Sequence, residues 1–175
     1  MSASPNIVLT GFMGTGKSTV GRLLAEALGR EFIDTDDVIV ARHGPISEIF
    51  AVHGEAHFRA VEGELARELA GRGNLVIATG GGMLLQDDVR ETFANDRLFC
   101  LTAASDVIVA RVLADRSGVV RPLLADPDAE ANVVRLLAER AARYREFDQL
   151  VTDDLTPMEI AEEILRRVTS SADNG

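Results

Sequence analysis

The chain has 175 residues, of which 46% are apolar and 26% are charged. This length and composition are typical of a single soluble globular domain, here residues 1–175, and exclude disordered and fibrous proteins. The net charge of −10 argues against a nucleic-acid partner, because proteins that bind phosphate backbones carry a basic face. An anionic ligand would need a local group of Arg or Lys side chains that overrides the acidic surface.

No apolar run approaches the roughly 20 residues that cross a bilayer, and the first residues show no charged leader followed by a long apolar segment. We therefore expect a cytoplasmic protein with no membrane partner, and we expect a monomer. The single cysteine, Cys100, excludes an internal disulfide and lies in an apolar run, so we expect it to be buried.

Short apolar runs alternate with stretches of helical periodicity along the chain. The runs predict five strands, at residues 6–10, 31–34, 74–79, 97–102 and 149–152. This alternation predicts an α/β fold in which a parallel sheet is covered by helices on both faces. Ligands of such sheets bind beyond the carboxyl ends of the strands, so the segments after Thr10, Ile33 and Thr79 should converge on one crevice.

Helix boundaries are signalled at several points. Gly29 closes the first predicted helix, whose apolar stripe is Val20, Leu23, Leu24, Ala27 and Leu28. The last helix begins with a capping box formed by Thr156 and Glu159, with Pro157 in the first turn. Asp126 and Pro127 predict the start of the helix before it. The tail, residues 169–175, is expected to be disordered.

A glycine-rich segment, GFMGTGKS (residues 11–18), follows the first predicted strand and matches G-x-x-x-x-G-K-[ST]. Glycines let backbone N–H groups converge on a polyphosphate, and the following helix adds its positive dipole end. Lys17 can reach the β- and γ-phosphates, and the Ser18 hydroxyl can bind Mg²⁺. The predicted ATP-binding residues of this segment are Gly14, Thr15, Gly16, Lys17, Ser18 and Thr19.

The loop alone does not reveal the acceptor of the γ-phosphate. The chain lacks the N-K-x-D tetrapeptide by which GTPases recognise guanine, and it is smaller than most motor and transporter ATPases. These features favour a kinase of small metabolites or nucleotides.

Three carboxylates lie within four positions in FIDTDDVI (residues 32–39). Charge of one sign at this density usually indicates a solvated turn. If strand geometry continues past Ile33, however, Asp34 and Asp36 point to the same side, toward the crevice, and Asp37 points away. Asp34 is then nearest the phosphate loop, where it would bind Mg²⁺ through the water shell of the ion.

Six motifs follow one another in the order, and at close to the spacing, of the shikimate kinases: GFMGTGKSTVGR, FIDTDD, GEAHFRAVE, IATGGGM, VRPLLADP and AERAARYRE. The chain resembles this family over residues 11–145. The resemblance implies a three-layer P-loop kinase fold, like that of nucleoside monophosphate kinases, with five parallel strands and a mobile lid. It further implies Mg²⁺-dependent transfer of the ATP γ-phosphate to the 3-hydroxyl of shikimate, a step in the synthesis of chorismate and aromatic amino acids.

The resemblance also implies a shikimate-binding region at about residues 34–62, with Asp36 at the acceptor hydroxyl. From their spacing alone, Arg59 and Glu62 could be no more than an i,i+3 ion pair on the helix surface. In the F-R-x-x-E motif of the family, however, this arginine clamps the substrate carboxylate and the glutamate orients it. Arg140 shares a helix face with apolar residues, where a guanidinium needs a buried anion, and the matching arginine of the family binds shikimate.

A triple glycine follows the third predicted strand, at a point where only residues without a Cβ let the backbone approach a ligand closely. In isolation it could equally be a loose turn. In shikimate kinases this segment lines the acceptor site, and the middle glycine, here Gly81, donates to the substrate. The predicted substrate-binding residues are Asp36, Arg59, Gly80, Gly81, Gly82 and Arg140.

The predicted lid spans about residues 115–127. Pro122 restrains Arg121, and Gly118 is a plausible hinge; a closing loop of this kind excludes water and brings positive charge to the phosphoryl group. In the family the arginine of RPLL has this role, and Arg116 and Pro157 are expected to border the adenine. The segment 117–120 is short for such a lid, and Leu155-Thr156 lacks the arginine often found before the proline.

The sequence therefore predicts a shikimate kinase in which Lys17, Asp36 and Arg121 are catalytic and Ser18 and Asp34 bind the metal. Asp36 would orient or deprotonate the attacking hydroxyl. Two alternatives stay open at this point. One is a kinase of another hydroxy acid, such as gluconate, and the other is a non-catalytic, nucleotide-dependent regulator with the same fold.

Overall fold

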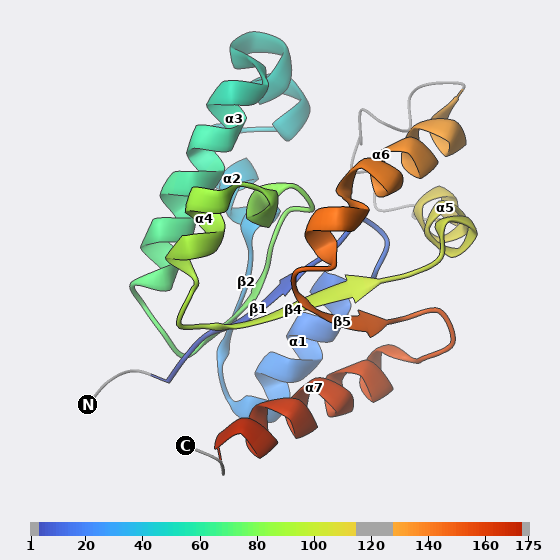
Figure 1. The fold of residues 1–175 in the computed structure, drawn as a ribbon. Coiled ribbons are helices and arrows are strands. Elements are labelled where there is room, and N and C mark those ends of the chain that lie inside the picture. The colour runs from blue at the N-terminus through green and yellow to red at the C-terminus, as the bar shows by residue number, and fades with distance from the viewer. Residues whose placement is uncertain (1–3, 115–127, 173–175) are drawn as a thin grey trace.

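The computed structural model describes residues 4–114 and 128–172. Its centre is a parallel sheet of five strands in the order β2-β3-β1-β4-β5 (Figure 1). The strands are β1 (Ile7–Thr10), β2 (Glu31–Asp34), β3 (Leu75–Ala78), β4 (Arg97–Thr102) and β5 (Asp148–Val151). All five predicted strands are confirmed, and every boundary lies within one residue of its prediction.

Helices connect the strands and cover both faces of the sheet. They are α1 (Lys17–Leu28), α2 (Thr35–His43), α3 (Ile46–Ala70), α4 (Asp87–Thr92), α5 (Ser105–Ala114), α6 (Ala129–Tyr144) and α7 (Pro157–Ala172), with a short 3-10 helix, η1 (Met83–Leu85). In Figure 1, α1 and α7 lie on one face of the sheet, and α2, α3 and α4 lie on the other. The predicted three-layer α/β architecture is confirmed.

Alternate residues of the strands supply two separate apolar cores, as the two-residue period of a strand requires. Leu9 packs with α1 and α7 on one face, whereas Val8 packs with α3 on the other. A third cluster lies at the carboxyl half of β4, where Cys100 of this strand and Phe12 meet α5 and α6. Cys100 is fully buried, as predicted.

The predicted helix caps agree with the structure, and two other predictions about the helices are corrected. Gly29 closes α1 in the left-handed conformation at φ 61°, and Thr156 and Glu159 form the reciprocal capping box of α7. The buried stripe of α1 includes Ala25, however, and Ala27 is exposed. The tail was predicted to be disordered from residue 169, but α7 continues to Ala172. Asp126 and Pro127 lie outside the described residues.

Helix α3 is kinked at Gly54, whose φ of 81° is left-handed and non-helical. Within the part of the chain that the structure describes, no helix is both long enough and apolar enough to cross a membrane.

Candidate active site

The phosphate loop joins β1 to α1 at the carboxyl edge of the sheet. Its backbone needs glycine, because a Cβ on Gly11 would lie 2.1 Å from the carbonyl oxygen of Leu101 and the φ of Gly11 is 130°. Lys17 Nζ donates to the carbonyl oxygens of Gly11 and Phe12, both at 2.8 Å. The buried Thr15 hydroxyl also donates to the Phe12 carbonyl, at 2.7 Å. The loop therefore curls around its own lysine at the positive end of α1.

Ser18 and Asp34 lie together beside this loop. The Ser18 hydroxyl donates to Asp34 Oδ2 at 2.6 Å, and Asp34 Oδ1 accepts from the backbone N–H of Asp36 at 3.1 Å. Asp34 thus caps α2 while its other oxygen faces the phosphate loop. A hydroxyl and a carboxylate are the hard oxygen ligands that suit Mg²⁺.

The strand geometry assumed for the acidic segment is wrong. β2 ends at Asp34, and Asp36 and Asp37 belong to the first turn of α2, where carboxylates are favoured by the helix dipole. The two side chains nevertheless diverge. A Cβ on Gly80 would lie 2.7 Å from Asp36 Oδ1, so Asp36 faces the triple glycine. Asp37 is 78% exposed and lies 4.0 Å from Arg22.

Arg59 is held by two carboxylates on α3. Its Nη1 lies 2.6 Å from Glu62 Oε2, and its Nη2 lies 2.9 Å from Glu55 Oε1. The Glu62 side chain is 1% exposed, and burial raises its pKa to about 7. The charge of Arg59 opposes this rise in pKa, and the charge of Asp36 adds to it. The pair is therefore a buried feature of the site, rather than the surface pair that its spacing alone would allow.

Arg140 reaches the same place from α6. Its guanidinium carbon lies 5.5 Å from the centre of the Phe12 ring, a cation–π contact with the phosphate loop. A Cβ on Gly81 would lie 3.5 Å from Arg140 Nη1 and 3.7 Å from Tyr144 Oη. The Tyr144 hydroxyl donates to the Gly81 carbonyl oxygen at 2.7 Å.

The triple glycine is the meeting point of these segments. Gly80 faces Asp36 and Glu62, Gly81 faces Arg140, and a Cβ on Gly82 would lie 2.5 Å from Arg59 Nη1. The backbone N–H of Gly80 donates to the buried Thr35 hydroxyl at 2.9 Å. At Gly80 and Gly82 a charged side chain lies where a Cβ would be, and a Cβ on Gly81 would lie 3.3 Å from the carbonyl oxygen of Gly11. Two carboxylates and two guanidinium groups thus surround a glycine backbone segment beside the phosphate loop.

Comparisons with known proteins identify the family. The family model for shikimate kinase matches residues 13–169 of the chain. The chain belongs to the shikimate kinase family. The shikimate kinase of Thermodesulfovibrio yellowstonii is 42% identical over 164 residues, which cover 92% of this chain and 93% of that protein.

Solved structures give the same result. The shikimate kinase of Acinetobacter baumannii in complex with shikimate has a TM-score of 0.88 and 38% identity, and the match covers 96% of this chain and 94% of that one. A gluconokinase from Sinorhizobium meliloti has a TM-score of 0.67 at 23% identity, over 99% of this chain and 97% of that one. The second likeness concerns the fold alone.

The structure brings most of the residues predicted from the shikimate kinase resemblance together. The phosphate loop, Asp34, Asp36, Arg59, the triple glycine and Arg140 lie around one edge of the sheet. Thr19 is exposed on the first turn of α1, and Pro157 is the exposed first residue of α7. Arg116 and Arg121, with the predicted lid, lie outside the described residues.

Two residues that contact this candidate site were not among the predicted site residues. Tyr144 is one of the residues on the apolar helix face that carries Arg140, and no polar role was predicted for it. Arg111 of α5 donates to Thr152 Oγ1 at 3.0 Å and to the Gly14 carbonyl of the phosphate loop at 3.4 Å. Neither contact had a local signal, because Gly81, Gly14 and Thr152 are each tens of residues away in the chain.

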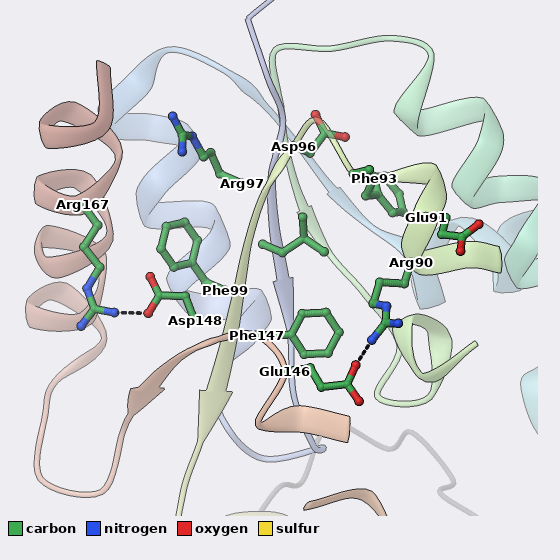
Figure 2. A pocket seen from close by; sticks show the side chains of 12 residues that line it. Arg90, Glu91, Phe93, Asp96, Arg97, Phe99, Glu146, Phe147, Asp148 and Arg167 are labelled. Carbon is green, nitrogen blue, oxygen red and sulfur yellow. Dashed lines mark hydrogen bonds and ion pairs between the residues drawn. The ribbon is translucent and has the colours of Figure 1, made fainter. Parts of the chain in front are cut away.

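A second hollow lies away from this site. A cavity of about 650 Å³ opens at the amino ends of β4 and β5, the sheet edge opposite the phosphate loop (Figure 2). Two ion pairs flank it, Arg90 with Glu146 and Arg167 with Asp148. None of the predicted site residues lines this cavity.

Proposed function

We propose that this protein is an ATP-dependent shikimate kinase, which transfers the γ-phosphate of ATP to the 3-hydroxyl of shikimate and yields shikimate 3-phosphate. Membership of the shikimate kinase family supports the activity. The observation that carries the choice of acceptor is the pair of guanidinium groups, Arg59 and Arg140, facing the triple glycine beside the phosphate loop. In a chain of net charge −10, this local positive group is what an acceptor carboxylate requires.

On the nucleotide side, the phosphate loop would bind ATP through its backbone N–H groups and the dipole of α1. Lys17 and Arg121 would stabilise the charge on the transferring phosphoryl group. Arg116, Pro157 and Thr19 complete the proposed nucleotide site, and Arg111, which links Gly14 to Thr152, is positioned to support it.

We also propose that Ser18 and Asp34 hold Mg²⁺, Ser18 directly and Asp34 through water. Their hydroxyl and carboxylate oxygens lie 2.6 Å apart and match the preference of this ion for hard oxygen ligands. When bound, Mg²⁺ would supply charge neutralisation at the β- and γ-phosphates.

On the acceptor side, Arg59 and Arg140 would bind the carboxylate of shikimate, and the amides of Gly81 and Gly82 would donate to its polar groups. Gly80 would line the site, with its own N–H bound to the Thr35 hydroxyl. Asp36, in the first turn of α2, would orient the attacking hydroxyl or accept its proton. Phosphoryl transfer passes through a loose transition state, so positioning and charge stabilisation outweigh the strength of the base.

A coupled assay of ADP release tests this function with shikimate, gluconate, quinate and no acceptor. Turnover with shikimate alone is the expected result. Turnover with gluconate but not shikimate would overturn the proposed substrate. If no acceptor increases turnover, the result would favour the alternative of a non-catalytic, nucleotide-dependent regulator. A monomeric state and a cytoplasmic location stay predictions from the sequence, and the first can be measured by light scattering.

A further inference from the structure

Tyr144 links two parts of the acceptor site and has no role in the mechanism above. It is the only tyrosine of the chain and the last residue of α6, and it is 4% exposed. Its hydroxyl donates to the Gly81 carbonyl oxygen at 2.7 Å. The Arg140 guanidinium, one helical turn earlier, reaches the same glycine: a Cβ on Gly81 would lie 3.5 Å from Arg140 Nη1 and 3.7 Å from Tyr144 Oη. The positive charge of Arg140 also opposes the rise in the pKa of this phenol. The guanidinium, the phenol and the glycine backbone therefore form one connected polar group.

Both the glycine backbone and the Arg140 side chain need a partner that fixes their positions. Glycine backbones are conformationally permissive, so three in succession do not hold one geometry by themselves. Fixing the Gly81 carbonyl also fixes the N–H of Gly82, which belongs to the same planar peptide unit and points the opposite way. The long Arg140 side chain, in turn, loses rotamer freedom when it lies between the phenol and the Phe12 ring.

Because Tyr144 is buried, the loss of its hydrogen bond to Gly81 would matter. Tyr144 belongs to the cluster that contains Phe12, Cys100 and Val133, and burial raises the pKa of its hydroxyl to about 12. A phenol is protonated at neutral pH, and the raised pKa extends the range over which this hydroxyl can donate to higher pH. Without the hydroxyl, the Gly81 carbonyl would lose a buried partner.

We propose that Tyr144 is a positioning residue for the acceptor: its hydroxyl holds the Gly81 carbonyl and the Arg140 guanidinium in the geometry that binds the carboxylate of shikimate. This rests on the assignment of Arg140 and the triple glycine to the acceptor site. The role differs from packing, because it belongs to one oxygen atom and not to the aromatic ring.

The substitution Tyr144→Phe separates the two, since it removes the hydroxyl and keeps the ring. We expect the KM for shikimate to rise about tenfold, with kcat changed less than about twofold and the KM for ATP unchanged. Phe147→Leu is the matched packing control, because Phe147 packs on the same cluster. It should lower the melting temperature and leave the KM for shikimate unchanged.

The variant Arg140→Gln tells a failure of the role proposed for Tyr144 apart from a failure of the acceptor-site assignment. If this variant loses shikimate affinity while Tyr144→Phe does not, Tyr144 has no positioning role and the acceptor site stands. If neither variant changes the KM for shikimate, the acceptor site itself is misassigned. A Tyr144→Phe variant that loses melting temperature and affinity for both substrates to the same degree would reduce Tyr144 to packing.

Intrinsic fluorescence gives a readout that needs no Tyr144 variant. The chain has one tyrosine and no tryptophan, so its tyrosine emission comes from Tyr144 alone. Titration of the wild-type protein with shikimate should change this emission, because the ligand engages the Arg140 guanidinium that contacts the phenol. The change should be absent in Arg140→Gln. A wild-type emission that does not respond to saturating shikimate would contradict the proposed coupling.

Discussion

At the scale of single residues, neighbouring carboxylates of the acidic segment have different surroundings. Asp34 caps α2 and accepts from Ser18, Asp36 faces Gly80, and Asp37 is exposed to solvent. A helix produces this separation as well as a strand would, because successive side chains point about 100° apart around the helix axis. The roles proposed for these residues can therefore be tested by substitutions one position apart.

Asp36→Asn should abolish most of the turnover, by about a hundredfold or more, while ATP still binds. The amide keeps the size of the side chain but cannot accept the proton of the acceptor hydroxyl. Asp37→Asn is the matched control, since Asp37 is 78% exposed, and it should keep wild-type turnover. Steady-state kinetics and nucleotide titration make the measurement. Wild-type turnover in Asp36→Asn would remove Asp36 from the chemistry.

Glu62 should make the stability of the protein depend on pH. Its pKa rises from 4.5 to about 7 on folding because burial penalises the charged form. Between these values the folded state binds more protons than the unfolded state, so the free energy of unfolding falls as pH rises through this window. The full loss contributed by this group is roughly 3 kcal/mol.

Glu62→Gln should remove this part of the pH dependence, because glutamine does not titrate. Urea unfolding of wild type and variant, on both sides of the window, measures the difference. Glu64→Gln, an exposed glutamate on the same helix, should leave the wild-type profile unchanged. If wild type and Glu62→Gln lose stability equally as pH rises, Glu62 does not carry the raised pKa.

At the scale of elements, the segment between β3 and η1 depends on its neighbours. A Cβ on Gly80 would meet Asp36 of α2, a Cβ on Gly82 would meet Arg59 of α3, and Arg140 of α6 lies beside Gly81. The capping box of α7 and the glycine cap of α1 are, by contrast, local features that act within one or two turns. The site is thus assembled by packing between elements, and its helices begin and end by local rules.

Gly80→Ala should impair shikimate turnover by about tenfold or more. The added methyl group would lie 2.7 Å from Asp36 Oδ1 and 3.0 Å from Glu62 Oε1, so one of these carboxylates must move. Gly71→Ala is the control, because its nearest new contact, at 3.6 Å, is an ordinary van der Waals distance. Steady-state kinetics of both variants decide the matter, and unchanged catalysis in Gly80→Ala would show that the site tolerates a wider loop.

At the scale of the whole molecule, the protein combines an acidic surface with a local group of arginines. Surface ion pairs such as Arg42 with Glu68 lie outside the site. Arg59 is paired as well, with Glu55 and Glu62, but its guanidinium and that of Arg140 face the triple glycine. The net charge of −10 therefore does not describe the groups that an acceptor would meet there. The low local dielectric strengthens interactions there, which is also why the pKa of Glu62 is raised.

The sequence by itself determined the five strands, the phosphate loop and the helix caps. Each of these depends on residues close together in the chain: a two-residue period, a loop of eight residues, a cap three residues from its partner. Only the tertiary structure decided that β2 ends at Asp34, that Glu62 is buried, and that Tyr144 and Arg111 contact the glycine segments. These features arise from packing between distant segments, which has no local pattern to reveal it.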